Sequence, residues 1–252
     1  MQTVMRTIYI MWLREMKRFF RSPARIIGAL GQPLIFLISF GFGFGQLFKA
    51  AGQGDYIQFL APGIIGMSII FGAIFNGLTI IMDRQFGFLK ETLVAPVPRI
   101  GIMLGRTLGG ATTACLQGCI VLVMTLFVGL HPQNWALVPA ALGVMLVIGA
   151  LFSALGCMFG SILRDMQGFQ LIMVFLVMPL FYLSGAMFPL KDVPRALQVV
   201  AALDPLSYGV DGLRTLLTGS THFGLAVDGT VLASVTAVFL ALGSYFFSRI
   251  EA

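Results

Sequence analysis

Few residues of this chain have the types and spacing that catalysis, metal binding or nucleotide binding require. The two histidines, His131 and His222, lie far apart in the sequence, and neither His-Glu-x-x-His nor Cys-x-x-Cys occurs. Each of the four lysines follows Met, Phe or Leu, so no Gly-Lys-Ser/Thr loop can cradle nucleotide phosphates. The cysteines lie in apolar segments and are expected to be small buried hydrophobes. We therefore predict that the chain is not an enzyme and holds no cofactor or metal of its own.

Charged residues instead gather in two segments, of which residues 4–22 are the first. Apolar residues recur there at helical spacing, with cations on the other side. This pattern predicts an amphipathic helix in the membrane interface, which either positions the following segments or simply anchors the chain. Its defining residues are Trp12, Arg14, Lys17, Arg18 and Arg21.

The second charged segment, residues 83–106, mixes charges with aromatic residues and contains Pro96-Val97-Pro98. Residues 84–94 can form about three helical turns, which the prolines end. A solvated connector would not need Phe86 and Phe88, so the segment indicates a docking surface for another protein, or contact with the bilayer surface.

The composition of the chain indicates that membrane-spanning helices position these two charged segments. The chain of 252 residues is 58% hydrophobic and only 10% charged, whereas soluble domains are about 25% charged. This excludes a soluble domain, and in a membrane protein the net charge of +6 marks loops rather than nucleic-acid binding. Charge-free intervals predict an all-α, single-domain polytopic membrane protein over 1–252. The expected spans are about 26–48, 57–82, 107–130, 136–161, 168–188 and 228–248.

Lys and Arg give the orientation, because cytoplasmic loops carry more of them. Twelve lie on the side that includes both termini and residues 83–106, against four on the other side, so both termini are expected in the cytoplasm. Residues 189–227 then lie outside, and their two semi-apolar stretches, 196–203 and 213–218, are too short to span a membrane. This segment is therefore expected either to dip back into the bundle or to cap it from outside. Asp211 and Arg214, at i,i+3, could pair there.

No predicted span has an ionisable residue near its centre, which argues against ion-coupled transport. The polar residues that remain suit either an amphiphilic cargo or hydrogen bonds between helices. They are Asn76, Thr79, Thr112, Thr113, Gln117, Thr125 and Ser153. Glycines at 101, 105 and 109, and at 156 and 160, predict close helix packing within the chain.

Three sequence elements together resemble type-2 ABC exporter permeases, especially the drug-resistance and nodulation-type branch. The first is Leu13-Arg14-Glu15-Met16-Lys17-Arg18 with Arg21-Ser22-Pro23. The second is Asp83-Arg84-Gln85-Phe86-Gly87-Phe88-Leu89-Lys90-Glu91-Thr92-Leu93 with Ala95-Pro96-Val97-Pro98-Arg99 and Gly105-Arg106. The third is Tyr182-Leu183-Ser184-Gly185-Ala186-Met187-Phe188-Pro189 with Pro194, Asp204-Pro205-Leu206-Ser207-Tyr208 and Asp211-Gly212-Leu213-Arg214.

The resemblance implies a dimer, expected to be a homodimer, with two copies of a separate ATPase that bind ATP and Mg. The second element looks like the coupling helix that docks on the ATPase, with Asp83, Arg84, Phe86, Phe88, Lys90 and Glu91 as its expected residues. Spans two and five are similar to those that line a cargo path, with candidates Met67, Phe71, Asn76, Phe175, Met178 and Tyr182. Short outer helices near the exit are implied for Phe188, Pro189, Asp204, Pro205, Tyr208, Asp211 and Arg214.

The expected function is export of a hydrophobic or amphiphilic small molecule, drug-like or lipid-like, across a bacterial cytoplasmic (inner) membrane. Glycan-exporting relatives often have a longer Arg/Tyr-rich run before span one, from which Arg18-Phe19-Phe20-Arg21-Ser22-Pro23 departs. Export of a glycan, lipo-oligosaccharide or glycolipid on the same machinery stays the alternative, and an ATP-independent channel or membrane scaffold is a further one. Membrane lipid is an expected partner and nucleic acid is not.

Overall fold

The computed structural model of the chain describes residues 2–50, 54–89, 94 and 97–249, and these parts contain helices but no β-strand. Six helices are long: α1 (Gln2–Phe20), α2 (Pro23–Ala50), α3 (Tyr56–Gln85), α5 (Arg99–Val128), α6 (Val138–Ile162) and α11 (Leu225–Ser248). The shorter elements are η1 (Trp135–Leu137), α7 (Met166–Ile172), the π-helix η2 (Met173–Val177), α8 (Met178–Leu183), η3 (Leu190–Asp192), α9 (Arg195–Leu203) and α10 (Pro205–Thr218).

Within the described residues, six segments are long and apolar enough to cross a membrane, so the predicted all-α polytopic fold is confirmed. They are Ile26–Phe48, Tyr56–Gln85, Arg99–Val128, Trp135–Ile162, Met166–Leu183 and Leu225–Ser248. The third begins at Arg99, ahead of the expected start at 107, because the helix starts directly after Pro98 and continues through Arg106. The fifth ends at Leu183, before the expected end at 188, since Gly185 has a positive φ of 72°.

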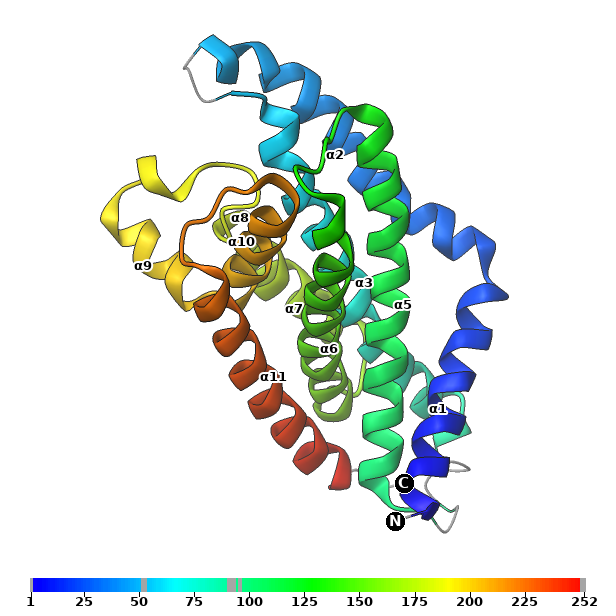
Figure 1. Ribbon diagram of the computed structural model, residues 1–252. Coiled ribbons are helices and arrows are strands. Elements are labelled where there is room, and N and C mark those ends of the chain that lie inside the picture. The colour runs from blue at the N-terminus through cyan, green and yellow to red at the C-terminus, as the bar shows by residue number, and fades with distance from the viewer. Residues whose placement is uncertain (1, 51–53, 90–93, 95–96, 250–252) are drawn as a thin grey trace.

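The helix α3 is the most enclosed part of the bundle (Figure 1), with 78% of its most apolar stretch buried. It packs against α6 and α5, and α11 lies along α6. The start of α1 and the end of α11 lie at the same end of the molecule, as an even number of spans requires. The helix α2 leans away from this body, and only 22% of its span is buried.

Glycines allow the closest helix contacts. A Cβ on Gly77 of α3 would overlap the carbonyl of Gly156 on α6, and one on Gly160 would overlap the carbonyl of Gly77. On α5, a Cβ at Gly105 would lie 2.6 Å from Met11 Cβ and 2.8 Å from the Ile8 carbonyl oxygen of α1. The predicted close packing within the chain is confirmed for both glycine series. The series on α5 contacts α1, and the series on α6 contacts α3.

The segment between the fifth and sixth spans forms short helices, of which α10 enters the bundle. Its apolar residues Leu206, Val210, Leu213 and Leu217 repeat at helical spacing and are fully buried. They pack toward α3, α6 and α11. In α9, by contrast, Leu203 is 79% exposed. Pro205 is the first residue of α10, as its fixed φ favours, and Pro194 directly precedes α9.

Candidate functional site

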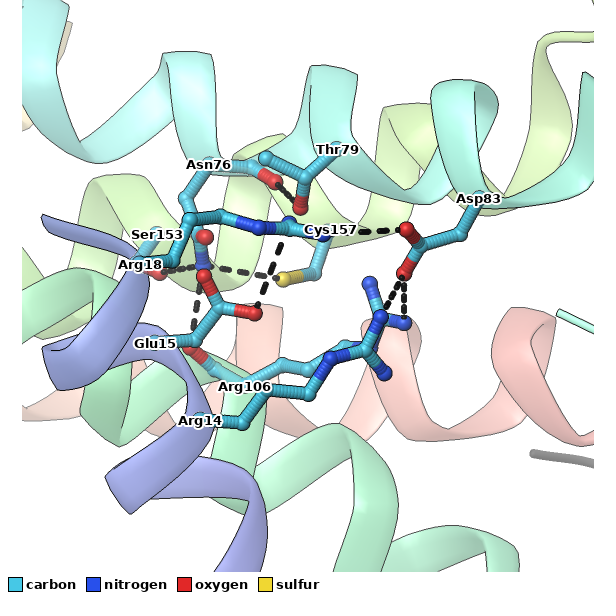
Figure 2. A network of polar contacts seen from close by, with 9 residues as sticks. All are labelled: Arg14, Glu15, Arg18, Asn76, Thr79, Asp83, Arg106, Ser153 and Cys157. Carbon is cyan, nitrogen blue, oxygen red and sulfur yellow. Dashed lines mark hydrogen bonds and ion pairs between the residues drawn. The ribbon is translucent and has the colours of Figure 1, made fainter. Parts of the chain in front are cut away.

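The carboxylate of Asp83 joins three helices near the end of α3 (Figure 2). Its Oδ2 accepts hydrogen bonds from Nη2 of Arg14 at 3.1 Å and Nη2 of Arg106 at 2.5 Å, and its Oδ1 accepts from Arg18 at 3.2 Å. Asp83 and Arg106 are 2% and 1% exposed. A buried carboxylate is costly unless cations and hydrogen bonds compensate it. These arginines, from α1 and α5, therefore tie both helices to α3.

Further contacts hold α1 against the bundle. Glu15 is buried and lies 3.8 Å from Arg18, and the indole N–H of Trp12 donates to Thr112 Oγ1 at 3.1 Å. Met16 and Phe19 are buried as well. One side of the helix thus contacts the protein rather than lipid. Of the two roles left open for this helix, these contacts favour positioning the bundle.

Two turns before Asp83, Asn76 ties α3 to α5 and α6. Its Nδ2 donates to the Arg106 carbonyl at 2.9 Å and to Ser153 Oγ at 3.2 Å (Figure 2). Thr79 donates to the carbonyl of Asn76 at 2.7 Å. Several of the polar span residues are therefore hydrogen-bonding groups inside the bundle, one of the two uses expected for them.

The residues expected to contact an ATPase differ in accessibility. Asp83 is buried, and Arg84 donates to the carbonyls of Ser161 and Leu163 at the end of α6, at 3.0 and 2.8 Å. Both side chains thus hold the end of α3 in place. On either side of Gly87, whose φ is 82°, Phe86 and Phe88 are 66% and 53% exposed. The expected docking residues Lys90 and Glu91 lie outside the described residues.

A cavity of about 530 Å³ lies among α1, α2, α3 and α5. Three cargo-path candidates, Met67, Phe71 and Asn76, line it together with Phe19 and Phe75. Polar groups also reach it, from Gln32, Thr79, Thr113 and Gln117. An apolar wall with a few hydrogen-bonding groups is typical of small-molecule sites.

The other three cargo-path candidates do not join this cavity. Phe175 and Tyr182, on η2 and α8, are 77% and 41% exposed, and Met178 between them is partly buried. The structure therefore divides the six candidates between an internal cavity and an external face of the fifth span.

Asp211 and Arg214, whose spacing allows an ion pair, form none among the ion pairs of the described residues. Asp211 accepts hydrogen bonds from the backbone N–H groups of His222 and Phe223 at 2.9 and 2.8 Å. Arg214 donates to the carbonyls of Phe59 and Gly185 at 3.3 and 3.0 Å. The two side chains thus join α10 to different segments: Asp211 to the residues that follow α10, and Arg214 to α3 and the turn at Gly185. Spacing of i,i+3 permits an ion pair but does not require one.

The remaining outer candidates shape the ends of α9 and α10. Asp204 caps α10 by accepting from Leu206 N at 2.8 Å, with Pro205 at the first helical position. Tyr208 donates to the Ala202 carbonyl at 2.7 Å. Phe188 and Pro189 are partly buried, and Pro189 lines an outer cavity of about 370 Å³ with Asp211 and Arg214.

Arg106 is the residue of this site that sequence reasoning missed. The sequence places it among the loop charges before the third span and in the second element of the resemblance, without a partner, yet the side chain is fully enclosed and pairs with Asp83. The available signal was Asp83 itself, a carboxylate at the end of a long apolar segment, which needs a cation nearby. Which arginine supplies it follows only from the packing of α5 on α3.

Replacing Asp83 by Asn should release α1 from α5. The change keeps the side-chain shape but leaves Arg106 as a buried cation without its partner, which costs about 3–5 kcal/mol. We expect faster hydrogen–deuterium exchange of the amides of residues 2–20 in detergent. Asp165→Asn, which alters an exposed cap of α7, should leave this exchange unchanged. Equal exchange in wild type and Asp83→Asn would contradict the assignment.

The outer helices should respond to pH through Asp204. Burial raises the pKa of this carboxyl to about 7, so the folded protein binds its proton more tightly than the unfolded chain does. Stability should therefore rise as pH falls from 8 to 5. Asn keeps a cap oxygen but does not titrate, so the Tm of Asp204→Asn should rise less over this range. Asp55→Asn, an exposed cap of α3, should keep the wild-type rise, and an equal rise in Asp204→Asn would refute the prediction.

Comparison with known proteins agrees with this architecture. The family described as ABC-2 type transporter matches residues 6–218. Nodulation protein J of Rhizobium meliloti (strain 1021) is 28% identical over 242 residues, which cover 94% of this chain and 89% of that protein. Inner membrane transport permease YadH of Escherichia coli (strain K12) is 29% identical over 233 residues, which cover 91% and 90%. The chain therefore belongs to the ABC-2 type transporter family and is a multi-pass membrane transport permease.

Proposed function

We propose that the chain is the permease subunit of an ATP-driven exporter that moves a hydrophobic or amphiphilic small molecule out of the cytoplasm or the inner leaflet. The observation that carries this proposal is the cavity among α1, α2, α3 and α5, whose apolar wall carries amide and hydroxyl groups. Its volume of about 530 Å³ is in the range of small-molecule sites. The permease would lie in a bacterial cytoplasmic membrane with both termini inside the cell.

A separate ATPase is proposed to supply the energy, because the sequence has no loop of its own for nucleotide phosphates. ATP and Mg would bind in that partner, which ABC-2 permeases generally require. The exposed Phe86 follows directly on the end of α3, next to the Asp83 cluster. A partner that pushes on Phe86 would therefore act on α3, and through Asp83 on α1 and α5.

A second copy of the chain is proposed to complete the transport path. On the fifth span, Leu171, Val174, Phe175 and Tyr182 are all more than a third exposed and follow helical spacing. Such an apolar face requires lipid or protein against it. A homodimer that brings two such faces together would place Phe175, Met178 and Tyr182 along the cargo path.

Export of a glycan, lipo-oligosaccharide or glycolipid is the second candidate. It is favoured by the amide of Gln117 and the hydroxyl of Thr113, which offer hydrogen bonds that a purely apolar cargo would not use. The two candidates differ in which molecules should stimulate ATP hydrolysis: hydrophobic dyes for the first, glycolipids for the second.

Replacing Phe86 by Asp should separate the permease from its ATPase. A desolvated aromatic anchor in an interface contributes about 2 kcal/mol or more, so retention of the partner should fall at least about tenfold. The measurement is affinity purification from native membranes, followed by mass spectrometry and an ATP-hydrolysis assay. Trp135→Asp changes an aromatic of similar exposure between α5 and α6, which connect at the end of the bundle opposite to the end of α3 (Figure 1), and should retain the partner. If wild type captures no ATPase after cross-linking in the membrane, a channel or scaffold replaces the proposal.

Replacing Phe71 by Ala should change which cargo is accepted. The ring lines the cavity, and its removal takes away apolar contact that we expect to shift the cargo concentration for half-maximal ATPase stimulation about tenfold. Phe127→Ala removes the same group from a position that is 88% exposed and outside the cavity. An unchanged cargo profile in Phe71→Ala, or an equal change in Phe127→Ala, would mean that cargo does not use this cavity.

A further inference from the structure

The outer side of α1 carries a basic groove, formed by Ile10, Leu13, Arg14, Lys17, Arg18, Arg21 and Ser22, with a volume of about 530 Å³. Its members from 10 to 21 follow one helical stripe. The groove is distinct from the cavity proposed for cargo, which lies on the side of α1 that faces α2 and α3 and shares only Arg18 with it.

Positive charge in the groove exceeds the carboxylates available to it. Arg14 and Arg18 share the Asp83 carboxylate with the buried Arg106, and Arg18 also lies near Glu15. Lys17 and Arg21 are exposed and form no ion pair with any carboxylate in the part of the chain that the structure describes. Five cations thus stand against two carboxylates, and this surplus favours an anion.

The groove retains donors with which to hold that anion. The side chains of Arg14 and Arg18 are each about one third exposed although they bind Asp83. A guanidinium has five N–H donors, so each arginine can hold Asp83 and still offer N–H groups to a second oxyanion. Planar guanidinium groups match phosphate oxygens in pairs, and an ammonium such as that of Lys17 adds a point charge.

The position of the groove selects a phospholipid as the source of the phosphate. It ends at Ser22, and the first membrane-spanning segment begins four residues later, at Ile26. The cations therefore lie at the depth of lipid headgroups, where basic amphipathic segments meet anionic lipid. Ile10 and Leu13 add an apolar side to the groove, against which the glycerol end of a lipid can pack.

We propose that the basic groove of α1 binds the phosphate headgroup of an anionic phospholipid. The bound headgroup bridges Lys17 and Arg21 to Arg14 and Arg18 and relieves the repulsion among these cations. This binding needs neither cargo nor an ATPase, so its test is separate from that of the proposed function.

The test measures lipid retention by the full-length protein in detergent, by native mass spectrometry after incubation with phosphatidylglycerol or phosphatidylcholine. Wild type should retain phosphatidylglycerol at least about tenfold better, and salt should weaken this retention. Lys17→Gln/Arg21→Gln should lose the preference while keeping the ion pairs of Asp83. Arg6→Gln/Arg195→Gln removes the same charge from exposed positions outside the groove and should keep it. Lys17→Arg/Arg21→Lys should also keep it, which separates loss of charge from misfolding.

Three outcomes would overturn the proposal. One is equal retention of the two lipids by wild type, and another is an unchanged preference in Lys17→Gln/Arg21→Gln. The third is complete displacement of the lipid by excess inorganic phosphate with no preference for lipid, which would identify a site for free phosphate. If Lys17→Gln/Arg21→Gln keeps its lipid but loses a co-purifying protein, the groove is a protein-docking surface instead.

Discussion

A carboxylate buried at the end of a membrane-spanning helix must be given cations, and much of this bundle is arranged to meet that requirement at Asp83. Arg106 reaches it from α5, and Arg14 and Arg18 reach it from α1. The glycines of α5 let α1 approach closely enough for these contacts. Three helices are therefore fixed at one point, directly before the exposed aromatics of the loop that follows α3.

The two sides of α3 have opposite properties. Toward α6, Gly77 and Gly156 bring the backbones into contact, and Asn76 adds hydrogen bonds to α5 and α6. Toward α2 there is a cavity instead, and α2 itself is only slightly covered. A closely packed pair, α3 and α6, beside the loosely packed α2 is a suitable arrangement for transport. One helix can move while the pair keeps its position.

Sequence alone was sufficient for what depends on long, regular patterns. The charge-free intervals gave six spans, and the amphipathic spacing of residues 4–22 gave α1, because a helix in lipid must satisfy its own backbone. The contacts made by single side chains were not predictable in the same way. Arg106 pairs with Asp83 across 23 positions of sequence, whereas the hydrogen bonds of Asp211 and Arg214 go to other partners although their spacing allows a pair. Such choices depend on how helices pack, which no local pattern encodes.

The order of the three arginines around Asp83 also bears on how the protein is made. Arg14 and Arg18 precede Asp83 in the chain, and Arg106 follows it. Two of the cations are therefore synthesised before the carboxylate and one after it. An uncompensated charge at the centre of a membrane-spanning helix costs about 2.5–3.5 kcal/mol on insertion scales, and less toward the ends. Asp83 can meet the arginines of the first helix as it emerges, and Arg106 then enters beside a carboxylate that is already in place. An order of assembly in which α1 and α3 associate before α5 is inserted would keep the carboxylate of Asp83 compensated at each stage.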